Sequence, residues 1–177
     1  MIFDEYYIKS RISLINDWPK PGVKYRDLTP IYADPKATRM VTDVFIQRYI
    51  DYKLTHIAVI DARGFIIGST IAYGLNLPLI LIRKPGKLPG DVFKEDYKTE
   101  YSDECLEIKE DKFEKDCRIL LFDDLIATGG TLMAATALIE RLDGNVIEAA
   151  SIIDLPELKG SSELQDANVP TFSLIGF

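Results

Sequence analysis

The chain has 177 residues, of which 47% are hydrophobic and 28% charged, and these values are ordinary for a soluble globular protein built as one domain. Its formal net charge of -7 argues against a general nucleic-acid or anionic-membrane surface, because such surfaces recruit Lys and Arg to offset phosphate charge. Any phosphate-binding site must therefore be local.

Neither the cysteines nor the start of the chain suggests a secreted or membrane protein. Cys105 and Cys117 have no CxxC spacing and no nearby histidine, so neither a metal cluster nor a disulfide framework is indicated. The first residues, MIFDEYYIKS, lack a basic segment followed by an apolar stretch, and no apolar run is long enough to span a membrane. We therefore expect a cytoplasmic protein.

The predicted elements begin with a helix at the N-terminus. Ile8, Ile12 and Ile15 recur at helical spacing. The turn-rich stretch WPKPG at 18–22 predicts the end of this segment and an irregular loop after it.

Strands and helices then alternate along the chain. Asp34 followed by Pro35 is the pattern of an N-cap with proline in the first turn, and it predicts a helix over residues 36–51. The other predicted elements are strands over 56–61, 78–82, 118–122, 145–153 and 171–177, and helices over 64–75 and after Gly130. This alternation predicts an α/β fold with a mostly parallel, twisted sheet and helices on both faces.

The stretch LLFDDLIATGGTLM places two acids at the end of a predicted strand. In open α/β sheets, ligands bind beyond the carboxyl ends of the strands, which is where Asp123 and Asp124 lie. The next residues form a small turn before a helix, where free backbone N–H groups can hold a phosphate; they are Ala127, Thr128, Gly129, Gly130 and Thr131.

Either feature alone is usually only a solvated loop or an ordinary turn. Together they suit a sugar monophosphate, with the acids on the sugar hydroxyls and the turn on the phosphate. The turn is not a Walker A motif, because it lacks the lysine that would reach further phosphates.

DDLIATGGT resembles the phosphoribosyl-pyrophosphate (PRPP) motif of the type I phosphoribosyltransferases, and the whole chain is similar to the adenine-specific members of that family. Five further blocks carry the resemblance in the family's order: WPKPGVKYRDLTPIYADP, DARGFIIGSTIAYGL, LIRKPGKLPG, TEYSDECLEI and SIIDLPELKG. The resemblance implies a type I phosphoribosyltransferase fold in a single domain over 1–177, with a hood (1–33 plus 154–170) over the base site, a lid (87–103), and assembly as a homodimer.

The implied reaction is attack of adenine N9 on C1 of PRPP, which releases pyrophosphate and forms AMP. Mg²⁺, held mainly through pyrophosphate oxygens, ribose hydroxyls and water, would neutralise the leaving group. Asp123 and Asp124 would accept hydrogen bonds from the ribose hydroxyls and place negative charge near the oxocarbenium-like transition state. Four cations would meet the pyrophosphate: Arg63, Arg83, Lys84 and Lys87. In similar enzymes, the peptide that corresponds to Asp61-Ala62 is cis.

The polar stretch over 87–103 is long for a connection in a compact domain, which predicts a mobile lid that excludes water from C1. Glu100 and Tyr101 resemble the family's lid dipeptide, and this resemblance makes Glu100 the catalytic acid or base at the purine imidazole.

The resemblance also assigns the base pocket. Tyr25 would stack on the purine, with Leu155 on its other face, while Arg26 and the backbone of Lys24 would hydrogen-bond the purine edge. Ala127 stands where 6-oxopurine relatives carry an aspartate, which favours adenine over hypoxanthine or guanine.

One assignment is declined and two alternative functions stay open. The single histidine, His56, opens a predicted strand at the end opposite the ligand edge and has no triad partners, so we do not assign it to catalysis. A PRPP- or nucleotide-binding regulator without catalysis would be expected to carry a basic face or a nucleic-acid-binding extension. A transferase for another purine, such as xanthine, stays open because Lys24 could answer an extra carbonyl.

Overall fold

A parallel sheet forms the centre of the computed structural model, which describes residues 3–98 and 103–177. The strand order is β10-β9-β7-β3-β4, and the short β8 pairs with β9. The strands are β3 (His56–Ile60), β4 (Leu79–Ile82), β7 (Arg118–Phe122), β8 (Leu125–Ile126), β9 (Asn145–Asp154) and β10 (Thr171–Gly176). The predicted α/β class with a mostly parallel sheet is confirmed.

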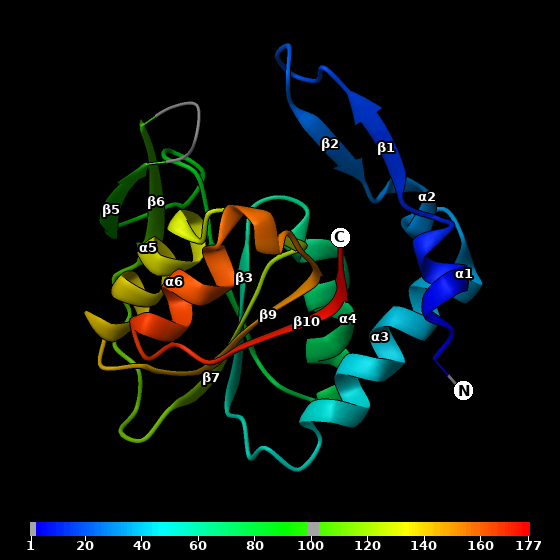
Figure 1. Cartoon of the computed structure of the whole chain (residues 1–177). Helices are drawn as coiled ribbons and strands as arrows, with labels where there is room; N and C mark the ends of the chain where they lie inside the picture. Colours follow the sequence, from blue (N-terminus) through cyan, green and yellow to red (C-terminus); the bar gives the residue numbers. More distant parts are fainter. Residues whose placement is uncertain (1–2, 99–102) are drawn as a thin grey trace.

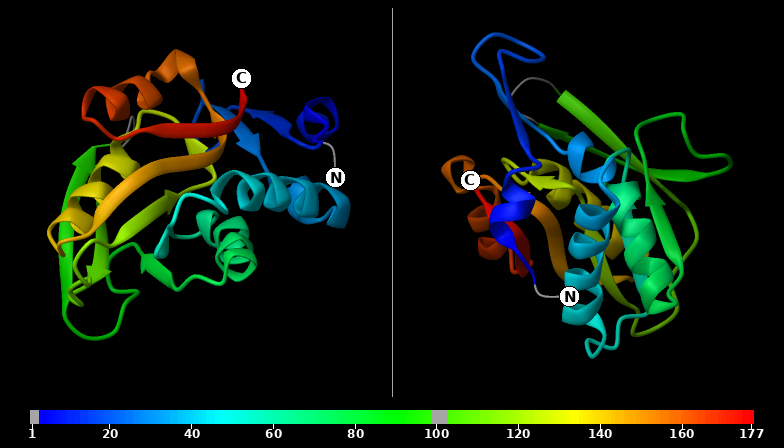
Figure 2. Two further views of the ribbon diagram at one scale, coloured as in Figure 1. Left: turned by 90° about the horizontal axis from the view of Figure 1, so that it is seen from below. Right: turned by 90° about the vertical axis from the view of Figure 1, so that its right-hand side faces the viewer.

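Helices cover both faces of this sheet (Figure 2). On one face lie α3 (Pro35–Tyr49) and α4 (Gly64–Leu75), and on the other α5 (Gly130–Glu140) and α6 (Gly160–Asp166). The side chains of β7 alternate between these two cores, as the two-residue period of a strand requires: Leu120 and Phe122 join the first core, and Ile119 and Leu121 the second.

The helix boundaries follow from local signals in the sequence. The Asp34 carboxylate caps α3 by accepting from the backbone N–H of Lys36 at 2.9 Å and of Ala37 at 3.2 Å. Glycines let α4 lie close to the sheet, because a Cβ on Gly68 would be only 2.2 Å from Val59 Cγ1. A Cβ on Gly64, the first residue of α4, would lie 3.1 Å from the Phe122 backbone oxygen, so α4 begins directly beside the carboxyl end of β7.

The N-terminal helix predicted through Ile15 is wrong beyond its first turns. Helix α1 covers only Glu5–Lys9, and an antiparallel hairpin of β1 (Ser13–Asn16) and β2 (Lys24–Asp27) follows, with Ile15 opposite Tyr25. Spacing at 8, 12 and 15 fits a helix, but the second strand supplies a pairing partner that periodicity along one segment cannot reveal. A short helix, α2 (Thr29–Tyr32), links the hairpin to α3.

The segment 87–103, predicted as a polar loop, contains one strand of a second hairpin and the start of the other. Strands β5 (Val92–Lys98) and β6 (Asp103–Lys109) pair antiparallel, and residues 99–102 between them lie outside the described part of the chain. Figure 1 shows both hairpins rising at the same end of the sheet, and the side view in Figure 2 agrees. The remaining element is a short 3₁₀ helix, η1 (Pro156–Leu158), after β9.

Within the described ranges, every helix is too short or too polar to cross a membrane.

Candidate functional site

A cleft of about 490 Å³ lies at the carboxyl ends of the central strands. It is lined by the second strand of the N-terminal hairpin, the start of α4, the segment from β7 into α5, and the turn after β9. The lining residues are Gly22, Val23, Lys24, Tyr25, Arg26, Arg63, Asp123, Asp124, Leu125, Ile126, Ala127, Thr128, Gly129, Thr131, Leu132, Leu155, Glu157 and Leu158.

The two acids of this cleft follow β7. Asp123 is half-buried and Asp124 is buried, and the Asp124 backbone N–H donates to Asp123 Oδ1 at 2.8 Å. Burial raises the pKa of the Asp123 carboxyl well above its usual range, and the neighbouring Asp124 charge raises it further. Burial also raises the pKa of Asp124, while the Arg63 charge opposes that shift. The surroundings therefore disfavour the charged forms of the two carboxyls. Hydrogen bonds from ligand hydroxyls, or a nearby cation, would stabilise these charged forms.

Arg63 is the cation closest to these acids. Its Nε lies 2.8 Å from Asp124 Oδ2, and its Nη1 donates to the Tyr25 hydroxyl oxygen. The Tyr32 hydroxyl is also buried nearby and has no hydrogen-bond partner within the described residues. Burial raises the pKa of Tyr32, and the Asp124 charge adds to this effect, so Tyr32 stays neutral.

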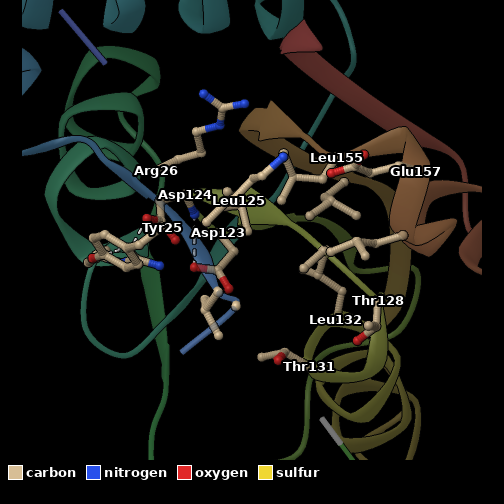
Figure 3. Close-up of a pocket in the computed structure, with 18 residues that line it drawn as sticks. Tyr25, Arg26, Asp123, Asp124, Leu125, Thr128, Thr131, Leu132, Leu155 and Glu157 are labelled. Carbon is tan, nitrogen blue, oxygen red and sulfur yellow. Dashed lines mark hydrogen bonds and ion pairs between the residues drawn. The ribbon is translucent and has the colours of Figure 1, made fainter. Parts of the chain in front are cut away.

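The turn between β8 and α5, with the first residues of that helix (127–131), has the geometry of an anion site, and we call this segment the anion turn. Gly129 has a φ of 82°, a left-handed conformation that favours glycine, and α5 begins at Gly130 with free backbone N–H groups at its first turn. In Figure 3 the Thr128 and Thr131 side chains lie at this helix start. Gly160 of α6 supports the turn, because its N–H donates to Ala127 O at 3.0 Å and a Cβ on it would be 2.2 Å from that oxygen.

The residues expected to hold a base lie on two sides of the cleft. Tyr25 lies on one side of the two aspartates, and Leu155 and Glu157 lie on the other (Figure 3). Trp18 packs its ring against Tyr25, with centroids 4.4 Å apart and an interplanar angle of 64°. The Arg26 guanidinium lies 4.3 Å from the centroid of the Phe177 ring, which fixes its direction.

The other three predicted cations, Arg83, Lys84 and Lys87, are not among the residues that line this cleft. Arg83 Nε lies 2.9 Å from Asp61 Oδ2, and its Nη1 donates to Lys87 O at 3.1 Å. Lys84 Nζ lies 3.5 Å from Glu104 Oε2. Arg83 thus ties the start of the 83–87 loop to the residue before Ala62, and the Asp61-Ala62 peptide is cis.

Glu107 on β6 holds the same loop from the other side. Its Oε2 accepts from Gly86 N–H at 2.8 Å, and its Oε1 lies 2.7 Å from Lys94 Nζ. The hydrogen bond from Lys94, followed by that from Gly86, lowers the pKa of the Glu107 carboxyl. Gly130 lies just outside the cleft lining, at the first position of α5.

The lid dipeptide, Glu100 and Tyr101, lies outside the described residues. At the stem of that hairpin, the Tyr97 side chain hydrogen-bonds Thr131, so β5 reaches the anion turn; burial raises the pKa of this tyrosine.

His56 begins β3 at the other end of the sheet, and Cys117 Sγ lies 3.7 Å from its Nδ1. Burial lowers the pKa of His56.

Sequence reasoning did not single out Gly160, Glu107 or Tyr97. Gly160 and Glu107 fall within two of the blocks that carry the family resemblance, SIIDLPELKG and TEYSDECLEI, but their roles depend on contacts between distant segments. Tyr97 carries no motif at all. Among the described residues, no group of three or more His, Cys, Asp or Glu side chains is arranged to hold a metal ion.

Comparison with known proteins gives the same family at the level of the sequence. A family model described as the phosphoribosyl transferase domain matches residues 28–174. The adenine phosphoribosyltransferase of Ectopseudomonas mendocina is 58% identical over 177 residues, which is 100% of this chain and 97% of that protein.

Solved structures are also similar over nearly the whole chain. The adenine phosphoribosyltransferase of Thermoanaerobacter pseudethanolicus has a TM-score of 0.92 at 37% identity, covering 97% of this chain and 99% of that one. The Trypanosoma brucei enzyme, solved in complex with AMP, pyrophosphate and ribose-5-phosphate, has a TM-score of 0.89 at 32% identity, covering 97% of this chain and 78% of that one.

Proposed function

Since the chain belongs to the adenine phosphoribosyltransferase family of purine salvage enzymes, we propose that its strand-end cleft is where the 5-phosphoribosyl group of PRPP is transferred to N9 of adenine. The products are AMP and pyrophosphate. One observation carries the proposal: a single cleft contains paired acids, an anion turn at a helix start, an arginine and an aromatic ring. These are the groups needed for a ribose, a phosphate, a pyrophosphate and a purine.

Asp123 and Asp124 bind the ribose 2- and 3-hydroxyls in this proposal. Hydroxyl donors stabilise the charged form of the carboxyls, which burial disfavours in both and the Asp124 charge disfavours further in Asp123. Their negative charge also lies where positive charge develops at C1. Ala127 to Thr131 bind the 5-phosphate through backbone N–H groups and the two threonine hydroxyls, with Gly129 and Gly130 leaving room for close approach.

The pyrophosphate lies at the Arg63 end of the cleft. Arg63 contacts the pyrophosphate directly, and the loop that contains Arg83, Lys84 and Lys87 closes over it. Arg83 acts through Asp61, to which it is paired, while the two lysines supply positive charge.

Magnesium fits this donor set. Two adjacent carboxylates with raised pKa values favour a nearby cation, but two carboxylates alone are too few to form a complete Mg²⁺ site. PRPP oxygens and water would therefore supply most of the ligands, and the ion would neutralise charge on the leaving pyrophosphate.

Adenine lies between Tyr25 and Leu155, with the Lys24 backbone and Arg26 at its edge. Ala127 offers no carboxylate to the purine N7, so proton transfer at the imidazole falls to Glu100 of the lid, with Tyr101 closing beside it. The hood (1–33 plus 154–170) and the lid (87–103) then bracket the reaction from two sides and exclude water from C1.

The protein acts as a cytoplasmic homodimer in this proposal. The consecutive elements α4 and β4 expose large apolar side chains, and covering them with a second subunit would remove this apolar surface from water. The most exposed is Tyr73, at 91%, and the others are Ile66, Leu79 and Leu81. The mass of the protein in solution, measured by light scattering for the wild type and Tyr73→Glu, tests this assembly: a dimer that dissociates in the variant supports it, and a wild-type monomer contradicts it.

The substrate assignment is tested by product formation from PRPP and each of adenine, hypoxanthine, guanine and xanthine, with and without magnesium. Magnesium-dependent turnover of adenine alone is expected. Turnover of xanthine would show that Lys24 sets a different specificity, and PRPP binding without turnover of any base would favour a regulator.

A further inference from the structure

The Tyr25 hydroxyl joins two parts of the cleft that the proposed function treats separately. Tyr25 belongs to the N-terminal hairpin and lines the base pocket, while Arg63 precedes α4 and faces the pyrophosphate end. Arg63 Nη1 donates to the Tyr25 hydroxyl oxygen, and the Arg63 Cζ lies 5.2 Å from the centroid of the Tyr25 ring. A side chain of the proposed base pocket, Tyr25, therefore directly contacts Arg63, the cation that we assign to the pyrophosphate.

Two contacts from different elements hold the Arg63 guanidinium. Asp124 Oδ2 lies 2.8 Å from Nε as an ion pair without hydrogen-bond alignment, whereas Nη1 donates a hydrogen bond to Tyr25. A guanidinium is planar and its N–H donors form a rigid fork, so the hydrogen bond to Tyr25 is the contact that sets its orientation. Arg63 caps no backbone group of α4 with its side chain, so the helix itself does not fix the guanidinium.

The Tyr25 ring is itself braced. Trp18 packs against it, edge to face, with centroids 4.4 Å apart, and Ile15 lies opposite Tyr25 in the hairpin register. This packing limits rotation of the ring and so fixes the place of its hydroxyl. A phenylalanine would keep the ring and its packing and would lose only the contact with Arg63.

We propose that the Tyr25 hydroxyl is a positioning group that orients Arg63 toward the pyrophosphate of PRPP and thereby couples the hood hairpin to the pyrophosphate end of the site. The inference rests on the proposed role of Arg63. Without the hydroxyl, Arg63 keeps its charge and its Asp124 contact but gains rotational freedom, so binding of the pyrophosphate has to restrict it again. A ligand without a pyrophosphate does not contact Arg63 in this proposal, so its affinity does not depend on the Tyr25 hydroxyl.

Tyr25→Phe tests the proposal by calorimetric binding of two ligands in the presence of magnesium. PRPP carries the pyrophosphate, whereas AMP carries the purine, ribose and 5-phosphate only. We expect PRPP to bind about three- to tenfold more weakly, within the range for losing one ordinary intramolecular hydrogen bond, because the hydroxyl acts on PRPP only through Arg63. AMP affinity should stay within about twofold, because the ring is retained. Tyr6→Phe, which removes a hydroxyl from a side chain that is 85% exposed on α1, is the matched control.

A double-mutant cycle identifies the partner. In an Arg63→Gln background, Tyr25→Phe should change PRPP affinity by less than about twofold, because the group that it orients is gone. If Arg63→Gln does not bind PRPP measurably, the comparison of PRPP with AMP in Tyr25→Phe alone still decides.

Equal weakening of PRPP and AMP in Tyr25→Phe would overturn the proposal, since the hydroxyl would then act through the purine pocket or the hairpin. Unchanged PRPP affinity would also overturn it while leaving the proposed function intact. Failure of the wild-type protein to bind PRPP would contradict both the positioning role of Tyr25 and the proposed function.

Discussion

Arg63 Nε lies 2.8 Å from Asp124 Oδ2, so the arginine that we assign to pyrophosphate and an acid that we assign to ribose are in direct contact. The contact follows from the topology, because Arg63 ends the connection after β3, Asp124 follows β7, and these two strands are parallel neighbours. The charges of the site are therefore mutually dependent, and changing one alters the others.

Removing the Asp123 charge should stabilise the protein and impair its function. The raised pKa of this carboxyl means that the folded state binds its proton more tightly than the unfolded state, so wild-type stability falls as pH rises from about 4 through the raised value. Asp123→Asn removes this loss. We expect a higher Tm at neutral pH, by about 2–4 °C for each kcal/mol relieved, and a gain that shrinks toward pH 4.

The same variant should bind PRPP at least about tenfold more weakly, because a charged acceptor for a ribose hydroxyl is lost. Thermal melts across pH together with PRPP titration measure both effects, with the exposed Asp51→Asn as control. A Tm gain that is independent of pH would show that the charge of Asp123 is not its cause.

Gly160→Ala should damage the anion turn from outside it. A Cβ at this position would lie 2.2 Å from Ala127 O and 2.5 Å from Gly129 N, and both are backbone atoms of the turn. We expect a loss of about 1–3 kcal/mol in the free energy of unfolding and at least about a tenfold rise in the KM for PRPP. Gly176→Ala, with nothing within 4 Å of its Cβ, is the control. Equal KM values for the two variants would mean that Gly160 does not position the turn.

Glu107→Gln should loosen the 83–87 loop. The carboxylate binds both Lys94 and the Gly86 N–H, and an uncharged amide would weaken the first contact. We expect the KM for PRPP to rise about two- to fivefold, since charge-assisted hydrogen bonds are roughly twice as strong as neutral ones. AMP affinity should be unchanged. The control is Glu110→Gln, an exposed acid close by on the chain.

The lowered pKa of Glu107 gives this contact a pH dependence as well. The ionised Glu107 carboxylate stabilises the fold fully above the pKa of Glu in the unfolded chain, about 4.3. This stabilisation is lost as pH falls through the lower pKa that Glu107 has in the folded protein. Kinetics of both variants near neutral pH, and melts at acidic pH, measure it. A KM that matches the Glu110→Gln control would exclude a role for Glu107 in holding the loop.

Glu100→Gln should reduce kcat for AMP formation by about 10²–10⁴, the usual contribution of a general acid or base. PRPP affinity should stay within about twofold of the wild type, because PRPP binding does not require proton transfer at the base. Steady-state kinetics with adenine, set beside direct PRPP titration, separate the two effects. Turnover equal to that of the wild type would assign the proton transfer to another group.

Local signals in the sequence predicted the main strands of the central sheet and the helices α3, α4 and α5, but not α6. The apolar run of β7 and the Asp34-Pro35 start of α3 are set by residues within a few positions of each element. The two hairpins were missed for a physical reason: β5 is a polar segment whose strand character comes from pairing, as Val92 does with Lys109, and in β6 only Leu106 and Ile108 alternate as buried apolar residues, which is a short local signal. Helix periodicity around Ile12 and Ile15 pointed to a helix where pairing produces a strand.

The paired acids and the turn before α5 could be proposed from local motifs, because they follow a strand and precede a helix, whereas Tyr25 and Arg26 within β2 were proposed only from the family resemblance. The contacts that support the cleft residues could not be predicted. Gly160 lies more than thirty positions after Ala127, and Arg63 lies 38 positions from Tyr25, so only the folded chain brings these partners together. The same limit applies to Arg83, whose pairing with Asp61 depends on the neighbouring strands β3 and β4.

A crystal structure with AMP bound is the most direct test of the proposed site. We expect the purine between Tyr25 and Leu155, the ribose hydroxyls within hydrogen-bonding distance of Asp123 and Asp124, and the 5-phosphate on the backbone of residues 127–131. A purine held away from Tyr25, or a phosphate bound at the 83–87 loop instead of the anion turn, would contradict it.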